Sequence, residues 1–381
     1  MLGRLMKEFP AVALVGPRQA GKTTLARTSF PRAQYWDFDR AADRARMDIA
    51  PEESLRAAKS PTILDEAQRM PDVFPTLRSV IDERRKVHGR FLILGSASPT
   101  LVRGISETLA GRIAFLELTP LRWRELAAHR VGRLDRLWFR GGFPDAFLAR
   151  SDAAWQRWME QYVRTFIERD LGVLGVDVPA ARLHRFSKLI AHLHGGIWNA
   201  SEAGSSLGIT YHTAQRYAEI LEQAYLIRLL PPWHANLGKR LVKHPKIYWR
   251  DSGLLHFHLG LSRSDDILAH PKAGASWEGF VIENILDREK ESHPASEAFF
   301  FRTHTGLECD LLLARGRTRV PVEIKLAERP DRSDVAKLRA VMKLLNARHG
   351  HLVSRISRTV RTADVTVWNV ADLLTQKRWI G

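Results

Sequence analysis

The sequence contains almost no cysteine and no long hydrophobic run. Cys309 is the single cysteine among 381 residues, which excludes an internal disulfide and any zinc cluster built from cysteines. No stretch approaches the roughly 18 consecutive apolar residues that a membrane-spanning helix needs, and the chain enters a predicted strand without a separate signal-type apolar region. We therefore expect a reducing compartment, no membrane contact and a cytoplasmic location.

Acidic residues are scarce relative to basic ones. Lys and Arg number 59 against 42 Asp and Glu, a formal net charge of +17. Because the excess is spread over the chain and forms no tail, it suits contact with a polyanion such as nucleic acid. An Arg-rich composition can equally reflect genome composition, so charge alone leaves both explanations open. The length predicts two or three domains.

The first part of the chain predicts a parallel sheet covered by helices. Short apolar runs alternate with helical patterns up to about residue 120. The predicted strands are Ala11–Val15, Gln34–Phe38, Thr62–Asp65, Phe91–Gly95 and Ile113–Leu118, with a surface helix at Val73–Arg85. Turn signals over residues 119–150 place a domain boundary near 150, so residues 1–150 are predicted to form one α/β nucleotide-binding domain.

A glycine-rich loop follows the first predicted strand and precedes a predicted helix. It consists of Gly16, Pro17, Arg18, Gln19, Ala20, Gly21, Lys22, Thr23 and Thr24, the pattern of a phosphate-binding loop. The glycines allow backbone N–H groups to wrap a β-phosphate, and the helix N-terminus adds partial positive charge. We expect Lys22 to bridge the β- and γ-phosphates and Thr23 to bind Mg²⁺. ATP and Mg²⁺ are the predicted ligands.

Polar residues end two of the later strands. At the end of the third strand, Asp65 is expected to hold Mg²⁺ through water and Glu66 to act as general base, which predicts ATP hydrolysis. Ser96 follows the fourth strand and is predicted to contact the γ-phosphate, with an ordinary polar strand end as the alternative. Arg103 and Arg112 are either surface charges or contacts to a phosphate in their own subunit or in a neighbour's, which leaves a homo-oligomer open.

Residues 151–246 predict a helical domain. A helix stops before Gly195, and helices at Asn199–Leu207 and from Tyr211 to about Gln223 are followed by a strand at Ile227–Leu230. Helix, short turn, helix and β wing is the plan of a winged helix-turn-helix. The candidate nucleic-acid contacts are Tyr211, His212, Gln215, Arg216, Lys239, Arg240, Lys243 and Lys246. Winged helices also act as ATPase lids and dimerisation modules, so DNA contact is one of several roles.

Residues 247–381 predict a third, α/β unit. Its expected elements are a strand at Ile247–Trp249, a helix around Trp277–Lys290, and strands at Ala298–Arg302, Cys309–Ala314 and Val320–Ile324. Its candidate site combines Glu278 and Glu283 on the helix with Asp310, Glu323 and Lys325 on the strands. Carboxylates on adjacent strands can share Mg²⁺, and a lysine two residues after a glutamate lies on the same strand face. The pattern predicts phosphodiester hydrolysis, with surface strand charges as the alternative.

Together these motifs resemble a large group of bacterial and archaeal predicted ATP-binding proteins. The resembling segments are Gly16–Thr24, Ile63–Gln68, Gly95–Ser98, Leu109–Arg112, Gly142–Pro144, Tyr248–Leu255, Gly306–Asp310 and Val322–Lys325. Trp249 stands where the family's Phe-x-Asp-x-Gly-Leu-Leu element begins with phenylalanine, and Cys309 stands where an aliphatic residue is usual.

The resemblance implies an AAA-type P-loop ATPase domain, a winged helix and a C-terminal domain of unknown function that looks like a PD-(D/E)XK nuclease, the restriction-endonuclease-like α/β fold. It favours Glu278 over Glu283 as the helix acid, beside Asp310, Glu323 and Lys325. Two functions follow. The chain is either an ATP-hydrolysing protein that acts on DNA, or a nucleotide-gated DNA-binding or regulatory scaffold with an inactive nuclease-like domain.

Overall fold

The described part of the chain forms two compact units. The computed structural model describes residues 1–95, 104–105, 107–167, 179–233 and 244–376. Among the described residues, the first unit is Met1–Pro120 with the short segment Gln223–Tyr225, and the second contains the described residues from Leu121 onward apart from that segment. Within the described ranges, no helix combines the length and the apolar character that crossing a membrane requires.

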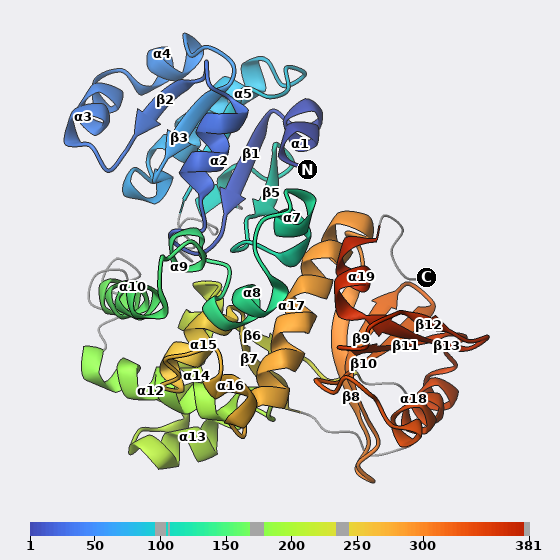
Figure 1. The fold of residues 1–381 in the computed structure, drawn as a ribbon. Coiled ribbons are helices and arrows are strands. Elements are labelled where there is room, and N and C mark those ends of the chain that lie inside the picture. Colours follow the sequence, from blue (N-terminus) through green and yellow to red (C-terminus); the bar gives the residue numbers. More distant parts are fainter. Residues whose placement is uncertain (96–103, 106, 168–178, 234–243, 377–381) are drawn as a thin grey trace. The chain divides into compact units, whose positions relative to one another are not determined.

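A five-stranded parallel sheet forms the centre of the first unit (Figure 1). Its strands are β1 (Ala11–Val15), β2 (Gln34–Asp37), β3 (Thr62–Asp65), β4 (Phe91–Leu94) and β5 (Ile113–Glu117). The order is β2-β3-β4-β1-β5, with every neighbouring pair parallel. All five predicted strands are confirmed. Because β4 lies between β1 and β3, the ends of the glycine-loop strand and the acidic strand are one strand apart.

Both faces of this sheet are buried under helices. Ala11, Ala13 and Val15 of β1 join the core that contains residues of α3 (Ala41–Ile49), α4 (Pro51–Arg56) and α5 (Val73–Glu83). The alternate residues Val12 and Leu14 join a second core with α1 (Leu2–Glu8) and α2 (Lys22–Ser29). A strand buried on both faces is a continuous run of apolar residues, which is why the sequence predicted β1.

The first unit ends earlier than the predicted boundary at residue 150. The segment after Pro120 contains α7 (Trp123–Ala128), α8 (Leu134–Arg140) and α9 (Pro144–Phe147), and it belongs to the second unit. Trp138 Nε1 donates to Ser276 Oγ at 2.9 Å, and Gly142 N donates to Asp251 Oδ2 at 2.7 Å. The turn signals marked a change of chain direction but carried no information about which core the segment joins.

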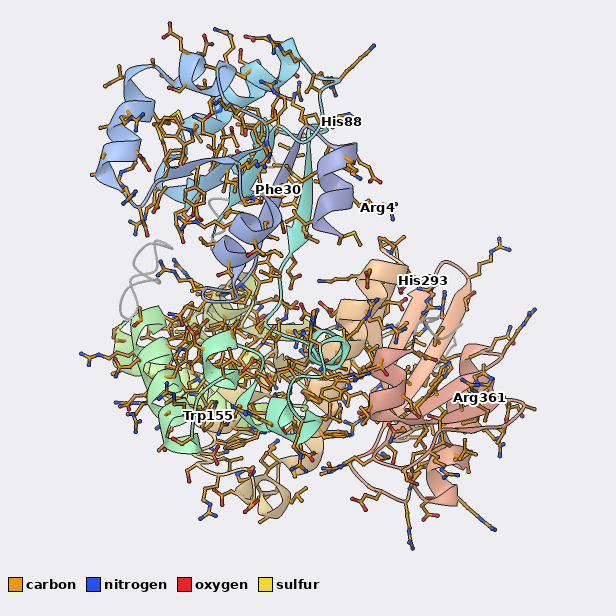
Figure 2. The ribbon with its side chains drawn as sticks, turned by 45° about the horizontal axis from the view of Figure 1, so that its top comes forward. Arg4, Phe30, His88, Trp155, His293 and Arg361 are labelled. Carbon is orange, nitrogen blue, oxygen red and sulfur yellow. The ribbon has the colours of Figure 1, made fainter. Side chains whose placement is uncertain are left out.

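Helices form the next part of the second unit. They are α10 (Asp152–Thr165), α12 (Ala180–Leu193), α13 (Ala200–Leu207) and α14 (Tyr211–Gln223). Trp155 of α10, labelled in Figure 2, is fully buried against the Phe139 ring, and its Nε1 donates to Arg140 O at 2.9 Å. Asn199 caps α13 by accepting from the backbone N–H of Ser201 and Glu202. The predicted helix boundaries in this region are confirmed.

A two-stranded antiparallel sheet follows, made of β6 (Ile227–Leu230) and β7 (Lys246–Trp249). The strand predicted at Ile247–Trp249 therefore pairs with β6, whereas the sequence placed it in the third unit. The predicted boundary at 246 divides this hairpin. A period-two pattern identifies a strand but does not identify its partner.

The C-terminal region builds a six-stranded mixed sheet (Figure 1). After α15 (Ser252–His258), α16 (Asp266–Ala269) and α17 (Ala273–Ser292) come β8 (Glu297–Arg302), β9 (Glu308–Arg315), β10 (Thr318–Ile324), α18 (Arg332–Leu345), β11 (Gly350–Ser354), β12 (Val360–Arg361), β13 (Val365–Asn369) and α19 (Val370–Thr375). The strand order is β12-β13-β11-β10-β9-β8. Strands β8, β9 and β10 are antiparallel, whereas α18 connects β10 to the parallel strand β11.

Glu283 connects the three regions that the sequence separated into domains. This α17 carboxylate is 2% exposed and accepts from Arg122 Nη2 at 3.3 Å, Arg228 Nη2 at 3.0 Å and Arg250 Nε at 3.1 Å. Burial opposes its charge, but Arg228, Arg250 and Arg122 together lower the pKa of Glu283. The arginines come from residues 121–150, from β6 and from the chain after β7, so one ion cluster joins all three regions in a single unit.

Three histidines of the second unit are buried without charge. His194 Nδ1 accepts from Trp249 N at 2.9 Å, while its Nε2 lies 3.1 Å from Ala275 O, so a single neutral tautomer satisfies both contacts. Burial lowers the pKa of His194 and of His258 to about 3 and that of His256 to about 4. Each ring must therefore stay neutral for the unit to keep its packing.

Acid should destabilise the second unit through these rings. The His194 ring takes up a proton near pH 6.5 in the unfolded chain but only near pH 3 in the folded chain. The stabilisation that comes from this difference is therefore fully present at neutral pH and is lost as the pH falls below about 6.5. Glutamine keeps a donor and an acceptor but takes up no proton. Between about pH 7.5 and 5, the free energy of unfolding of His194→Gln should therefore fall by about 2 kcal/mol less than that of the native chain. Urea unfolding of both chains at the two pH values measures this; identical pH dependence would contradict a neutral His194.

Candidate functional site

Two glycines determine the path of the loop after β1. A Cβ on Gly16 would lie 2.2 Å from the carbonyl oxygen of Leu118, which no side chain tolerates. Gly21 caps α2 with φ of 97°, in the left-handed region that favours glycine. The chain therefore turns sharply out of β1 and enters α2 with the backbone N–H groups of the first helical turn available to a ligand.

Lys22 lies at the start of α2 and points back over the loop. Its Nζ donates to Gly16 O at 3.0 Å and to Pro17 O at 2.8 Å, and the residue is 8% exposed. Burial lowers the pKa of Lys22 to about 8, against the opposing charges of Glu66 and Asp65. A partly desolvated ammonium of this kind gains more from an anionic ligand than an exposed lysine does.

The residues predicted to hold the metal lie in direct contact. Thr23 Oγ1 donates to Asp65 Oδ2 at 2.9 Å, which joins the first turn of α2 to the end of β3. The Tyr35 hydroxyl from β2 donates to the same carboxylate oxygen, a contact that the sequence analysis missed because nothing local marks it. Hydroxyl and carboxylate oxygens are ligands that Mg²⁺ accepts, so this pair fits the predicted ion.

Glu66 adopts an unusual backbone conformation beside this pair. Its φ is 53°, its N–H donates to Asp65 Oδ1 at 2.9 Å, and Gln68 Nε2 donates to its Oε2. A left-handed conformation at a non-glycine residue costs about 1 to 2 kcal/mol and occurs preferentially at functional sites. Burial raises the pKa of Glu66, which moves the carboxylate towards the range useful to a general base.

Of three other predicted residues, only one falls in the described part of the chain. Ser96 and Arg103 lie outside the described residues. Arg112 precedes β5, whose parallel register places Ile113 opposite Ala11 and Glu117 opposite Val15, so it lies at the opposite edge of the sheet from the loop. Five strand residues separate the two edges by about 16 Å, and Arg112 is bound bidentately by Asp82. The prediction that it contacts a phosphate in its own subunit is wrong.

A second acidic cluster lies at one end of β9 and β10. The antiparallel register pairs Val322 with Leu311, and continuing it by one residue places Glu323 opposite Asp310. Asp310 Oδ2 accepts from Ile324 N at 2.8 Å, and Lys325 Nζ lies 2.6 Å from Glu323 Oε1. Burial and the charge of Glu278 raise the pKa of Asp310, and burial also raises that of Glu323. The residues predicted as a nuclease-like site are therefore gathered at this edge.

Lys246 of β7 enters the same cluster and is 3% exposed. Its Nζ lies 2.5 Å from Glu308 Oε1, 3.1 Å from Glu278 Oε1 and 3.8 Å from Asp310 Oδ1. Burial favours the neutral amine, but Glu278, Asp310 and Glu308 outweigh it and raise the pKa of Lys246. The prediction of a phosphate contact at Lys246 is therefore wrong, and Glu308 is a further member of the cluster that no local pattern in the sequence marks.

Comparison with known proteins relates the chain to two mycobacterial proteins. The "Uncharacterized protein Rv2008c" of Mycobacterium tuberculosis and the "Uncharacterized protein Mb2031c" of Mycobacterium bovis are each 43% identical to it over 335 residues, which cover 86% of this chain and 73% of the relative. The chain belongs to the family of these mycobacterial proteins.

Family models match this chain in three stretches. Residues 8–127 match an "AAA domain", residues 131–265 a "Domain of unknown function (DUF8612)" and residues 273–373 a "Domain of unknown function (DUF4143)". The N-terminal part is therefore an AAA-type ATPase domain, as the motifs predicted. The winged helix and the nuclease-like fold stay predictions.

Two solved ATPase structures are similar to this chain at low sequence identity. The Walker-type ATPase PABY2304 of Pyrococcus abyssi is 14% identical with a TM-score of 0.47, and the match covers 68% of this chain and 93% of that one. A signal transduction ATPase with a tetratricopeptide repeat sensor, PH0952 of Pyrococcus horikoshii, is 12% identical with a TM-score of 0.26, covering 76% and 45%.

Apart from Lys246, which lies in the acidic cluster, the predicted DNA-contacting residues divide into three groups. Tyr211, His212 and Arg216 at the start of α14 are exposed. Gln215 instead accepts from Trp198 Nε1 at 3.1 Å and donates to Glu219 at 2.9 Å, so its amide is engaged within the fold. Lys239, Arg240 and Lys243 lie outside the described residues.

Proposed function

We propose that this chain is a Mg²⁺-dependent ATP hydrolase that acts on duplex DNA. The observation that carries the first half is the meeting of Lys22, Thr23, Asp65 and Glu66 where β1 and β3 end. Ligands of open α/β sheets usually bind at the carboxyl ends of the parallel strands. The residues that match the AAA domain, 8–127, include all four of these side chains.

Each residue of the site has a defined task in this proposal. The loop amides and Lys22 bind the phosphate oxygens, and the Thr23 hydroxyl and the Asp65 carboxylate would hold the metal. Mg²⁺ supplies positive charge against the phosphate oxygens. Glu66 orients a water molecule and accepts its proton, and its raised pKa suits that transfer. Conversion of ATP to ADP then changes the charge at the loop, the kind of change that moves attached elements.

The DNA half of the proposal is supported by α12 to α14 and the β6–β7 hairpin. Three helices followed by a hairpin match the plan of a winged helix-turn-helix. The start of α14, where a recognition helix meets a groove, exposes the aromatic Tyr211 and the cationic Arg216. The net charge of +17 supports the same partner, because basic surfaces attract the phosphate backbone.

DNA binding through α14 predicts a specific loss in Arg216→Ala. We expect the native chain to bind duplex DNA with an affinity that falls steeply with salt, and duplex DNA to raise its ATP turnover. Arg216→Ala should weaken DNA binding about tenfold. Fluorescence anisotropy with labelled duplex and phosphate release measure the two effects. Arg317→Ala is the control, because Arg317 is exposed in the β9–β10 turn. Equal losses in both variants would contradict an α14 interface.

A second function is favoured by the position of Lys246. A scaffold that binds DNA and leaves it intact agrees with an acidic cluster already neutralised by an ammonium group. The same DNA mixtures, supplemented with Mg²⁺ or Mn²⁺, distinguish the two functions. Intact duplex favours the scaffold, whereas cleavage that disappears in a Glu323→Ala, Lys325→Ala double variant favours an active nuclease.

A further inference from the structure

The acidic cluster of the C-terminal sheet does not have the form of a metal site. Mg²⁺ requires near-octahedral oxygen ligands at about 2.0 to 2.1 Å. In the described ranges, no group of three or more His, Cys, Asp or Glu side chains is arranged to hold a metal ion. Glu278, Glu308 and Asp310 instead lie around Lys246 Nζ at 3.1, 2.5 and 3.8 Å, distances that suit hydrogen-bonded or nearby ammonium contacts.

The lysine is fixed in this position by backbone contacts on its own side. Lys246 pairs with Leu230 in the β6–β7 hairpin and with Ile197 through an isolated bridge, and the neighbouring Pro245 O accepts from Trp198 N at 2.7 Å. The Phe300 ring lies 5.6 Å from the Nζ atom. The ammonium is therefore delivered by the hairpin, whereas the acids belong to α17 and β9.

The tyrosine two residues further along β7 makes the arrangement more specific. The Tyr248 hydroxyl donates to Glu278 Oε1, the same oxygen that Lys246 contacts. Lys246 and Tyr248 lie on one face of β7 because side chains alternate along a strand. Two donors from one strand thus occupy Glu278, the helix acid of the predicted nuclease-like site.

We propose that the Lys246 ammonium is the resident cation of this cluster and keeps divalent metal ions out of it in the native chain. The inference rests on the prediction that the acidic residues of the C-terminal sheet form a nuclease-like site. Ammonium and divalent metal compete for the same oxygens, and the two cations repel each other at such distances. Removal of the lysine should leave Glu278, Asp310 and Glu308 free to bind a metal ion.

Mn²⁺ binding to the full-length chain without nucleotide tests this. Free Mn²⁺ is measured by electron paramagnetic resonance during titration of the native chain, Lys246→Gln, Lys246→Arg, and Lys246→Gln combined with Glu278→Gln. We expect Lys246→Gln to gain one Mn²⁺ site at least about tenfold tighter than any in the native chain. Lys246→Arg keeps the positive charge and should gain none, and the double variant should lose the new site. A folded Lys246→Gln chain that binds no additional Mn²⁺ would overturn the proposal.

A second comparison stays decisive if Lys246→Gln fails to fold. The native chain and Glu278→Gln should bind the same number of Mn²⁺ ions, because the native cluster holds none. Loss of a Mn²⁺ site in Glu278→Gln would overturn the proposal. ATP turnover of the native chain is a separate readout at a different site, so absence of turnover would refute the ATPase proposal and leave the Lys246 result intact.

Discussion

A chain carrying Lys22→Ala should lose ATP turnover by a factor of about 100 to 1000, and it should bind ATP more weakly. Lys22 is 8% exposed and its ammonium donates to Gly16 O and Pro17 O, so no other lysine can take its place without rebuilding the loop. Its loss removes the positive charge that the first turn of α2 directs at the phosphates. Phosphate release and the affinity for a fluorescent ATP analogue measure the two effects. Unchanged turnover would remove the assigned site.

Two companion variants make this prediction specific. Glu66→Gln should also lower turnover, by about 100-fold or more, but it should leave nucleotide affinity nearly unchanged because its role is proton transfer. Lys86→Ala removes an exposed lysine of the same unit and should alter neither quantity. A Glu66→Gln chain that fails to bind nucleotide would show that Glu66 shapes the pocket and is not primarily a base.

The ATPase unit could be predicted from sequence because its signals are local. β1 and the loop are consecutive in the chain, and the apolar strand Thr62–Asp65 carries its two carboxylates at its own end. The contact of Thr23 with Asp65 then agrees with a parallel sheet, in which β1 and β3 end at the same side. Tyr35 was missed because its partner is 30 residues away and a tyrosine in a strand is ordinary.

The second unit was harder to predict because its decisive contacts are long-range. Lys246 follows several basic residues, so its neighbours in sequence suggested a phosphate contact, while its partners in space are acids of α17 and β9. In the first unit, packing likewise decides the outcome for Arg112, because the parallel register of β5 places it at the end of the sheet away from the loop. The sequence predicted that Lys246 and Arg112 bind anionic groups, and the packing of the fold determines that these groups are carboxylates of the chain itself.

The second unit should be strongly destabilised by Glu283→Gln. Glutamine matches glutamate in shape but leaves Arg122, Arg228 and Arg250 without their shared counter-charge, and removal of one partner of a buried ion pair costs about 3 to 5 kcal/mol. That is a large part of the free energy of unfolding of a typical domain, about 5 to 15 kcal/mol. The variant should therefore unfold at a much lower urea concentration or accumulate poorly. Urea unfolding with a probe in the second unit measures the loss.

Glu291→Gln is the matched control for this prediction, because the same chemical change is made on the same helix, α17. Glu291 pairs with Arg124, and the two side chains are 46% and 49% exposed, so the pair contributes about 1 kcal/mol or less. A double variant, Glu283→Met with Arg228→Met, should recover part of the loss if charge imbalance is the cause, since apolar replacements of buried ion pairs are often tolerated. If Glu283→Gln and Glu291→Gln cost the same, the three arginines are hydrated and the cluster does not hold residues 121–150, the hairpin and α17 together.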